Sequence, residues 1–302
     1  DWRHKGSPPH ELVTKTKPLR IINIMKSAIL IAIIAFVLPL SAQDKKWENS
    51  RKYTVEVPKN YDPKKKKYPL IVSLHGFTGN GAAQKGFFPL ADLAEKHGFL
   101  YSYPSGIGRS WNATNACCDF ARRHDDSSYL RNFILWAAGK YNIDKKRIYI
   151  TGLSNGGFMS YRMAMDHSDL VAAIAPFAGV GFKKWPAQPK HPVSVLHIHG
   201  TKDNVIKWKG GFILASSYPG AEENFENWRK FNKCDKSVDV SKLKIDLTRT
   251  VKGSETSSKR YTNKDGSVVT ELWRVDNGAH VTPPSGEARE RIVKWLLARS
   301  KK

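Results

Sequence analysis

Short apolar runs alternate with amphipathic stretches along most of this chain. The apolar runs are rich in β-branched or aromatic residues and are bounded by turn signals, a pattern that predicts buried strands. They cover residues 53–57, 69–74, 100–103, 147–151, 172–177, 193–198 and 268–275. Apolar positions at helical spacing predict helices between several of these runs, at residues 82–96, 127–138, 157–165, 221–231 and 286–299.

Strands that alternate with helices are typical of an α/β fold, in which a mainly parallel central sheet is covered by helices on both faces. No internal repeat and no linker rich in Pro, Gly and Ser divides residues 43–302, so we expect these residues to form a single catalytic domain. In such sheets, functional side chains gather at the carboxyl ends of the strands. We therefore expect the functional residues on the loops that follow the predicted strands.

Residues 25–42 have the features of a secretory signal peptide. Lys26 precedes the apolar run 28–40, which ends in the small residues Ser41 and Ala42. The run is shorter than the roughly 20 residues of a transmembrane helix, although a retained membrane anchor stays an alternative. Residues 1–24 lack an initiator methionine and have a loop-like composition, so we interpret them as a non-native or mis-called extension. A secreted or periplasmic protein without stable membrane insertion is predicted.

The chain carries a formal net charge of +23. Its positive residues are spread over lysine-rich loops such as 64–67 and form no single stripe with interleaved aromatic residues, which disfavours nucleic acid as a partner. A positive surface of this kind can attract acidic polymers. Polysaccharide that carries uronic acids would suit it.

A candidate nucleophile follows the predicted strand at 147–151. The chain continues as Gly152-Leu-Ser154-Asn-Gly156 and then enters the predicted helix at 157–165. This order of strand, G-x-S-x-G and helix is typical of a sharp turn that exposes a serine hydroxyl, and the glycines are needed where bulkier side chains would collide. Ser154 is therefore the predicted nucleophile.

A serine hydroxyl needs a base that takes its proton, and the base needs a carboxylate that orients it. On this kind of sheet, the acid and then the histidine follow the serine along the chain, each after a later strand. Asp203 lies on a turn after the run 193–198, and His280 lies on the loop after the run 268–275. We predict Asp203 as the acid and His280 as the general base.

The negative oxygen of a tetrahedral intermediate needs fixed donors. The glycine-rich turn after the run 69–74 can offer the backbone N–H of Phe77, and the residue after the nucleophile, Asn155, can offer a second N–H. We predict these two amides as the oxyanion hole.

The three cysteines Cys117, Cys118 and Cys234 predict one disulfide and one free thiol in an oxidising compartment. We favour a bridge from Cys117 or Cys118 to Cys234, with a vicinal bridge as the alternative. No metal is expected, because adjacent cysteines do not easily share a tetrahedral ion and because His197 and His199, on one face of their strand, have no evident third ligand. We interpret His199 as a packed histidine that supports the loop of Asp203.

With these residues in view, the chain resembles the esterase family that groups polyhydroxybutyrate depolymerases with feruloyl and acetylxylan esterases of the carbohydrate-esterase type. The resemblance spans roughly residues 50–298 and is carried by five motifs: LHGFTGNG at 74–81, WNATNACC at 111–118, DKKRIYITGLSNGG at 144–157, HGTKDNVI at 199–206 and GAHVTPP at 278–284. It implies an α/β-hydrolase fold, a triad of Ser154, Asp203 and His280, and no cofactor.

The resemblance also suggests roles for further residues. Trp111 is expected to wall an acyl pocket, with ordinary packing as the alternative, and Trp208 is expected near the mouth of the site. Asp125 and Asp126 are expected to cap the helix that follows them. Many relatives carry a tryptophan near Val281, so the rim of this pocket is expected to differ.

These features together predict a secreted serine carboxylic-ester hydrolase that works through an acyl-enzyme. The favoured substrate is a feruloyl or acetyl ester on plant cell-wall polysaccharide. A polyhydroxybutyrate or other polyester depolymerase is the first alternative. A serine peptidase and a non-catalytic binding protein on the same scaffold are less favoured, since the chain shows no amine-binding carboxylates and fills all three triad positions.

Overall fold

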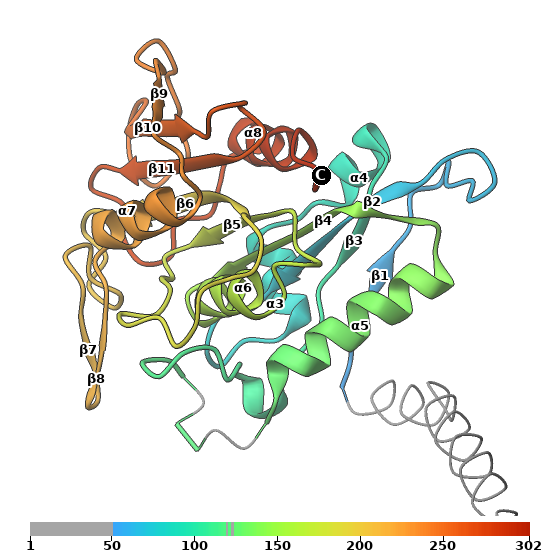
Figure 1. The fold of residues 1–302 in the computed structure, drawn as a ribbon, viewed down its shortest axis with the longest axis horizontal. Coiled ribbons are helices and arrows are strands. Elements are labelled where there is room, and N and C mark those ends of the chain that lie inside the picture. Colours follow the sequence, from blue (N-terminus) through green and yellow to red (C-terminus); the bar gives the residue numbers. More distant parts are fainter. Residues whose placement is uncertain (1–50, 119, 122–123) are drawn as a thin grey trace, which may run out of the picture. The chain divides into compact units, whose positions relative to one another are not determined.

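The computed structural model describes residues 51–118, 120–121 and 124–302, which belong to the compact unit Lys46–Lys302 (Figure 1). The predicted signal peptide at 25–42 and the extension at 1–24 lie outside the described residues. Among those residues, no helix combines the length and hydropathy that crossing a membrane requires.

A sheet of nine strands forms the centre of the protein, in the spatial order β1-β3-β2-β4-β5-β6-β11-β10-β9. The strands from β3 to β11 in this order are parallel, whereas β1 and the pair β10 and β9 are antiparallel to their neighbours. Their bounds are Val55–Glu56 (β1), Tyr68–Leu74 (β2), Leu100–Ser102 (β3), Ile143–Leu153 (β4), Ala173–Phe177 (β5), Ser194–Gly200 (β6), Lys236–Val238 (β9), Thr256–Thr262 (β10) and Val269–Val275 (β11).

Helices cover both faces of this sheet, so the apolar residues form two cores (Figure 1). On one face, the alternate residues Leu70 and Val72 of β2 pack with α5 (Asp126–Lys140), α6 (Asn155–Asp166) and α7 (Ala221–Phe231). On the other face, Ile71 packs with α4 (Ala91–His97) and α8 (Gly286–Leu297). The α/β architecture predicted from the alternating pattern is confirmed.

Several elements differ from the prediction. The helix expected at 82–96 is two helices, α3 (Gly81–Phe87) and α4, because Pro89 lies between them and cannot continue a helix. The antiparallel strands β9 and β10 were not predicted, since their sequences are polar and only partly buried. A separate hairpin of β7 (Gly211–Ile213) and β8 (Ser216–Tyr218) was also not predicted, because its strands are only 3 residues long and mostly not buried.

Candidate active site

Ser154 lies on the turn between β4 and α6, with the left-handed φ of 54° that such a turn requires. The glycines around it allow close backbone contact. A Cβ on Gly156 would lie only 2.1 Å from the carbonyl oxygen of Leu74, and one on Gly152 would lie 2.5 Å from the backbone of Gly156. The sequence therefore folds here into a strained turn that only glycines at these two positions permit.

His280 and Asp203 meet Ser154 at this edge of the sheet. Asp203 follows β6 and His280 follows β11, and these two strands are parallel neighbours. The Nε2 atom of His280 lies 2.9 Å from Ser154 Oγ, and its Nδ1 atom lies 2.8 Å from Asp203 Oδ2. The hydroxyl, the imidazole and the carboxylate thus form a continuous chain of hydrogen bonds, with His280 partly open to solvent.

The carboxylate of Asp203 is buried and held by several donors. Its Oδ1 atom accepts hydrogen bonds from the backbone N–H groups of Val205, at 2.9 Å, and Ile206, at 2.8 Å. Burial alone would raise the pKa of Asp203, but hydrogen bonds from His199 and His280 outweigh it and hold this pKa well below its usual value. Asp203 is therefore ionised and fixed in position whenever His280 needs a counter-charge.

The loop that carries Phe77 passes directly beside the nucleophile, because a Cβ on Gly76 would lie 3.6 Å from Ser154 Cβ. Within the part of the chain that the structure describes, no protein group accepts a hydrogen bond from the backbone N–H of Phe77 or of Asn155. Asn155 is the first residue of α6, where backbone N–H groups have no partner in the helix. Both predicted oxyanion donors are therefore available.

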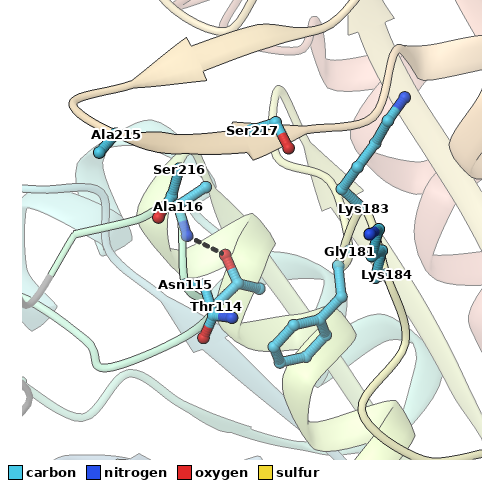
Figure 2. Close-up of a pocket in the computed structure, with 10 residues that line it drawn as sticks. Thr114, Asn115, Ala116, Gly181, Lys183, Lys184, Ala215, Ser216 and Ser217 are labelled. Carbon is cyan, nitrogen blue, oxygen red and sulfur yellow. Dashed lines mark hydrogen bonds between the residues drawn. The ribbon is translucent and has the colours of Figure 1, made fainter.

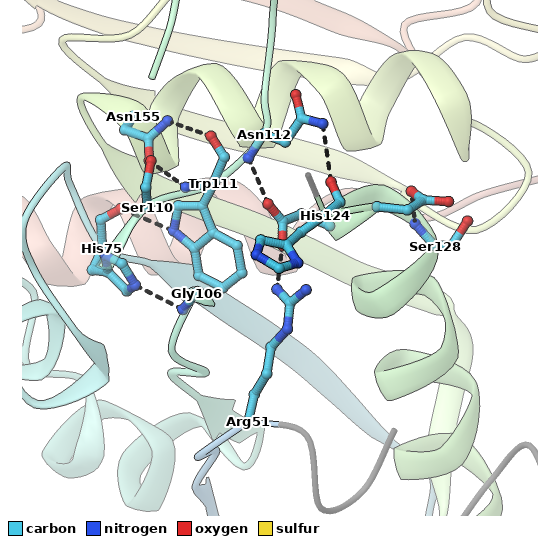
Figure 3. A network of polar contacts seen from close by, with 11 residues as sticks. Arg51, His75, Gly106, Ser110, Trp111, Asn112, His124, Ser128 and Asn155 are labelled. Carbon is cyan, nitrogen blue, oxygen red and sulfur yellow. Dashed lines mark hydrogen bonds and ion pairs between the residues drawn. The ribbon is translucent and has the colours of Figure 1, made fainter. Parts of the chain in front are cut away.

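A network of buried polar groups fixes this loop (Figure 3). The side chain of Asn155 accepts from Trp111 N at 2.7 Å and donates to Trp111 O at 2.9 Å, while the Trp111 indole donates to His75 O at 3.1 Å. His75 Nε2 accepts from Gly106 N at 2.9 Å, so its Nδ1 donates to Gly76 O at 2.8 Å. Burial lowers the pKa of His75, which keeps this ring neutral.

His75 was not singled out from the sequence, although its position just before the oxyanion turn was a usable signal. Trp111 is completely buried, so it braces the network and does not line an open pocket, contrary to the expectation that it walls the acyl group. Trp208 is half-buried, and its ring meets His199 edge-on at 5.9 Å, close to the triad.

The two aspartates expected to cap α5 make different contacts. Asp125 caps α5 by accepting from Ser128 N at 3.0 Å, and Asp126 forms a buried ion pair with Arg51 at the same helix end. The expected bridge to Cys234 is wrong.

Cys117 and Cys118 form the vicinal disulfide that was the alternative, and Cys234 is a buried free thiol. The Sγ atom of Cys234 contacts Oγ1 of Thr270 in β11, at 3.5 Å, and the carbonyl oxygen of Val268, at 3.6 Å. The vicinal disulfide contacts the residue that follows Ser154, since Asn155 Nδ2 is 3.7 Å from Cys117 Sγ.

Two exposed phenylalanines flank the site and were not predicted as binding residues. Phe77 is 49% exposed and Phe120 is 55% exposed, and their rings meet edge to face with centroids 6.4 Å apart. Val281, directly after the base, is 52% exposed. The rim of the site is therefore apolar and partly aromatic.

Comparison with known proteins identifies the family of this chain. A family model described as "Putative esterase" matches residues 45–206, more than half of the chain. The chain belongs to this esterase family. It is 31% identical to feruloyl esterase B of Piromyces equi over 197 residues, which is 61% of this chain and 36% of the relative.

A second relative is the bifunctional acetylxylan esterase/xylanase XynS20E of Neocallimastix patriciarum. It is 30% identical over 210 residues, which is 63% of this chain and 29% of that protein. The chain thus spans about a third of the length of these curated relatives.

Solved structures share the fold. An acetyl xylan esterase from Aspergillus awamori superposes with a TM-score of 0.57 at 18% identity, covering 82% of this chain and 94% of that one. A thermostable esterase gives a TM-score of 0.53, also at 18% identity, over 82% of this chain and 59% of its own. The fold of this esterase family member is that of an α/β-hydrolase.

Within the described residues, no group of three or more His, Cys, Asp or Glu side chains could hold a metal ion. His197 and His199 are instead paired with other protein groups.

Proposed function

We propose that this protein is a serine carboxylic-ester hydrolase. The observation that carries the proposal is the continuous contact from Ser154 Oγ through His280 to Asp203, next to two free backbone N–H groups. In this mechanism, His280 Nε2 takes the proton of Ser154 while Oγ bonds to the ester carbonyl carbon. The amides of Phe77 and Asn155 bind the negative oxygen that forms.

The intermediate then loses the alcohol. His280 gives its proton to the leaving oxygen as the carbon–oxygen bond breaks, which leaves an acyl group on Ser154. Water replaces the alcohol, loses a proton to His280 and attacks the acyl carbon, so that the acid leaves and the serine is restored. Asp203 stabilises the imidazolium that exists in both halves of the cycle.

The favoured acyl group is feruloyl. The exposed edge-to-face pair of Phe77 and Phe120 offers an aromatic surface at the oxyanion loop, and aromatic rings pack well in this way against a planar aryl group. The name of the Piromyces equi relative agrees with this choice. Acetyl is the second acyl group that the relatives' names support.

The favoured alcohol is plant cell-wall polysaccharide. A cavity of about 300 Å³ lies between the loop at 114–116, the segment at 181–184 and the β7–β8 hairpin (Figure 2). Thr114, Ser216, Ser217 and Lys184 are among the residues that line it, and this polar and positive lining suits sugar hydroxyls or a uronic acid. Lys183 is paired with Glu223, with its Nζ 2.6 Å from Oε2.

We also propose that the protein is secreted, on the basis of the leader-like residues 25–42.

A substrate panel tests this function. Methyl ferulate, para-nitrophenyl acetate, feruloylated and acetylated xylan oligosaccharides, a polyhydroxybutyrate suspension and a peptide anilide are offered to the wild type and to Ser154→Ala. We expect ester hydrolysis by the wild type alone, with methyl ferulate preferred. Clearing of the polyester with no ferulate hydrolysis would favour the depolymerase alternative, and no Ser154-dependent turnover of any ester would refute an esterase.

The aromatic pair is tested separately. Phe120→Ala is expected to lower kcat/KM for methyl ferulate about 3- to 10-fold, the range that an aromatic contact supports, and to leave acetyl ester hydrolysis unchanged. Phe212→Ala is the matched control, because Phe212 is 74% exposed on the β7–β8 hairpin. Equal losses on both esters would show that Phe120 does not read the acyl group.

A further inference from the structure

Behind the triad, a chain of buried polar contacts continues from Asp203 into the core. His199 Nε2 lies 2.7 Å from Ile206 O and 3.4 Å from Asp203 Oδ2. His199 Nδ1 lies 3.3 Å from His197 Nε2, and His197 Nδ1 lies 2.8 Å from the hydroxyl of Tyr161. His199, His197 and Tyr161 are buried, and the hydrolytic cycle described above uses none of them.

The protons in this chain have one arrangement when both rings are neutral. The carbonyl oxygen of Ile206 can only accept, so His199 carries its proton on Nε2 and its Nδ1 accepts. His197 must then donate from Nε2, and its Nδ1 accepts from the Tyr161 hydroxyl. The chain of donors ends at the carbonyl oxygen of Ile206, 2.7 Å from His199 Nε2, and Asp203 Oδ2 is a second, longer contact of the same nitrogen at 3.4 Å.

We propose that His199 is a positioning residue for Asp203, held in the required tautomer by His197 and Tyr161. This inference rests on the proposed function, because it assigns a device to the acid of the same triad. The Oδ1 atom of Asp203 is fixed by two backbone N–H groups, whereas Oδ2 has only His280 and the polar edge of His199. His199 prevents Oδ2 from turning away when His280 swings or becomes charged during the cycle.

The surroundings favour a neutral His197. Burial and then the neighbouring His199 lower the pKa of His197 far below its usual value, so His197 stays uncharged in the working range. The other groups that face His199 are Asp203 and the ring of Trp208, and the guanidinium of Arg274 lies 5.9 Å from that ring on its solvent side. His199 thus presents its Nε2–H to Ile206 O and, at a longer distance, to Asp203 Oδ2.

Substitutions at position 199 separate positioning from packing. His199→Phe keeps a ring but removes the donor, whereas His199→Gln can place an amide N–H near the position of Nε2. A hydrogen bond to a charged group corresponds to about 10- to 100-fold in rate, so we expect His199→Phe to lower kcat/KM for para-nitrophenyl acetate by about that factor and His199→Gln to restore most of it. His191→Gln, a substitution at an exposed histidine, is the control.

The pH–rate profile gives a readout that packing alone would not move. Without the His199 donor, the Asp203 charge is less neutralised and holds the proton of His280 more strongly, so the acid limb of kcat/KM is expected to move to higher pH in His199→Phe and not in His199→Gln. An unmoved limb in a folded His199→Phe variant, or a Gln variant as impaired as the Phe variant, would overturn the proposal.

Nitrogen-15 NMR of the full-length wild type tests the chain without any activity. We expect His197 to show a protonated Nε2 and an unprotonated Nδ1, and His199 to show the same tautomer in its neutral form. A neutral Nδ1–H tautomer at either ring, or an imidazolium at His197 near neutral pH, would contradict the arrangement. This result does not depend on ester hydrolysis, so the failure of this inference and the failure of the proposed function are distinguishable, and it applies even where His199→Phe does not fold.

Discussion

Replacement of Asp203 by Asn tests how the structure controls the proton on His280. The Oδ1 position of residue 203 is held by the N–H groups of Val205 and Ile206, which can only donate. In Asp203→Asn, the amide oxygen therefore stays at Oδ1, and the NH₂ group faces His280 Nδ1. Since NH₂ cannot accept, His280 must leave Nδ1 unprotonated and carry its proton on Nε2, which points at Ser154. The imidazole then has no lone pair for the serine proton.

The expected loss is large. A wrong tautomer at an otherwise intact triad costs about 10⁴ in kcat, or roughly 5 kcal/mol of barrier. Steady-state hydrolysis of para-nitrophenyl acetate measures it, with circular dichroism to verify folding. Asp276→Asn is the matched control, since Asp276 is an exposed carboxylate just after β11 that pairs with Arg274 at 3.0 Å. A loss of less than tenfold in a folded Asp203→Asn protein would refute the tautomer argument.

Three other predictions follow from the same structure. Burial would raise the pKa of Asp203, but hydrogen bonds from two histidines outweigh it and hold this pKa below its usual value, so the stabilising charge of Asp203 is present above about pH 4 and is lost only in stronger acid. The acid limb of the pH–rate profile between about pH 4 and pH 7 should therefore have the slope of one proton, and a slope of two would contradict this. Asp126→Ala leaves the buried guanidinium of Arg51 unpaired and should lower the free energy of unfolding by about 3–5 kcal/mol in urea titrations, whereas a change below about 1 kcal/mol would contradict the buried pair. Gly156→Ala should abolish activity because its Cβ would lie 2.1 Å from a carbonyl oxygen of β2, while Gly139→Ala, in open space on α5, should keep full activity and gain up to about 1 kcal/mol of stability.

The fold could be predicted largely because its strands are short apolar runs that end in turn signals. The parallel strands β2 and β5 are fully buried, and their sequences are nearly continuous apolar runs. The parallel strands β6 and β11, the first fully and the second almost fully buried, carry polar residues such as His197 and Glu271. The strands β7 to β10 escaped prediction because partly exposed antiparallel strands need no such runs. The break at Pro89 was visible in the sequence, but the apolar spacing on either side of it suggested a single helix.

The candidate site could be predicted only as far as local turn chemistry and chain order reach. The turn around Ser154 and the positions of Asp203 and His280 after their strands indicated where these side chains would meet, and their catalytic roles stay a prediction. The sequence did not reveal that Trp111 is buried under His75, that Cys117 pairs with its neighbour, or that His197 links His199 to Tyr161. Each of these depends on contacts between segments that only the folded chain brings together.

Covalent labelling of the nucleophile tests the central claim most directly. The full-length protein is treated with a fluorophosphonate, which bonds to an activated serine oxygen with loss of fluoride, and the product is examined by intact mass and peptide mapping. We expect one adduct per chain, on Ser154, with a matching loss of ester hydrolysis and no adduct in Ser154→Ala or in the folded His280→Ala variant. An adduct on another residue, or ester hydrolysis that persists after Ser154 is fully labelled, would contradict the account.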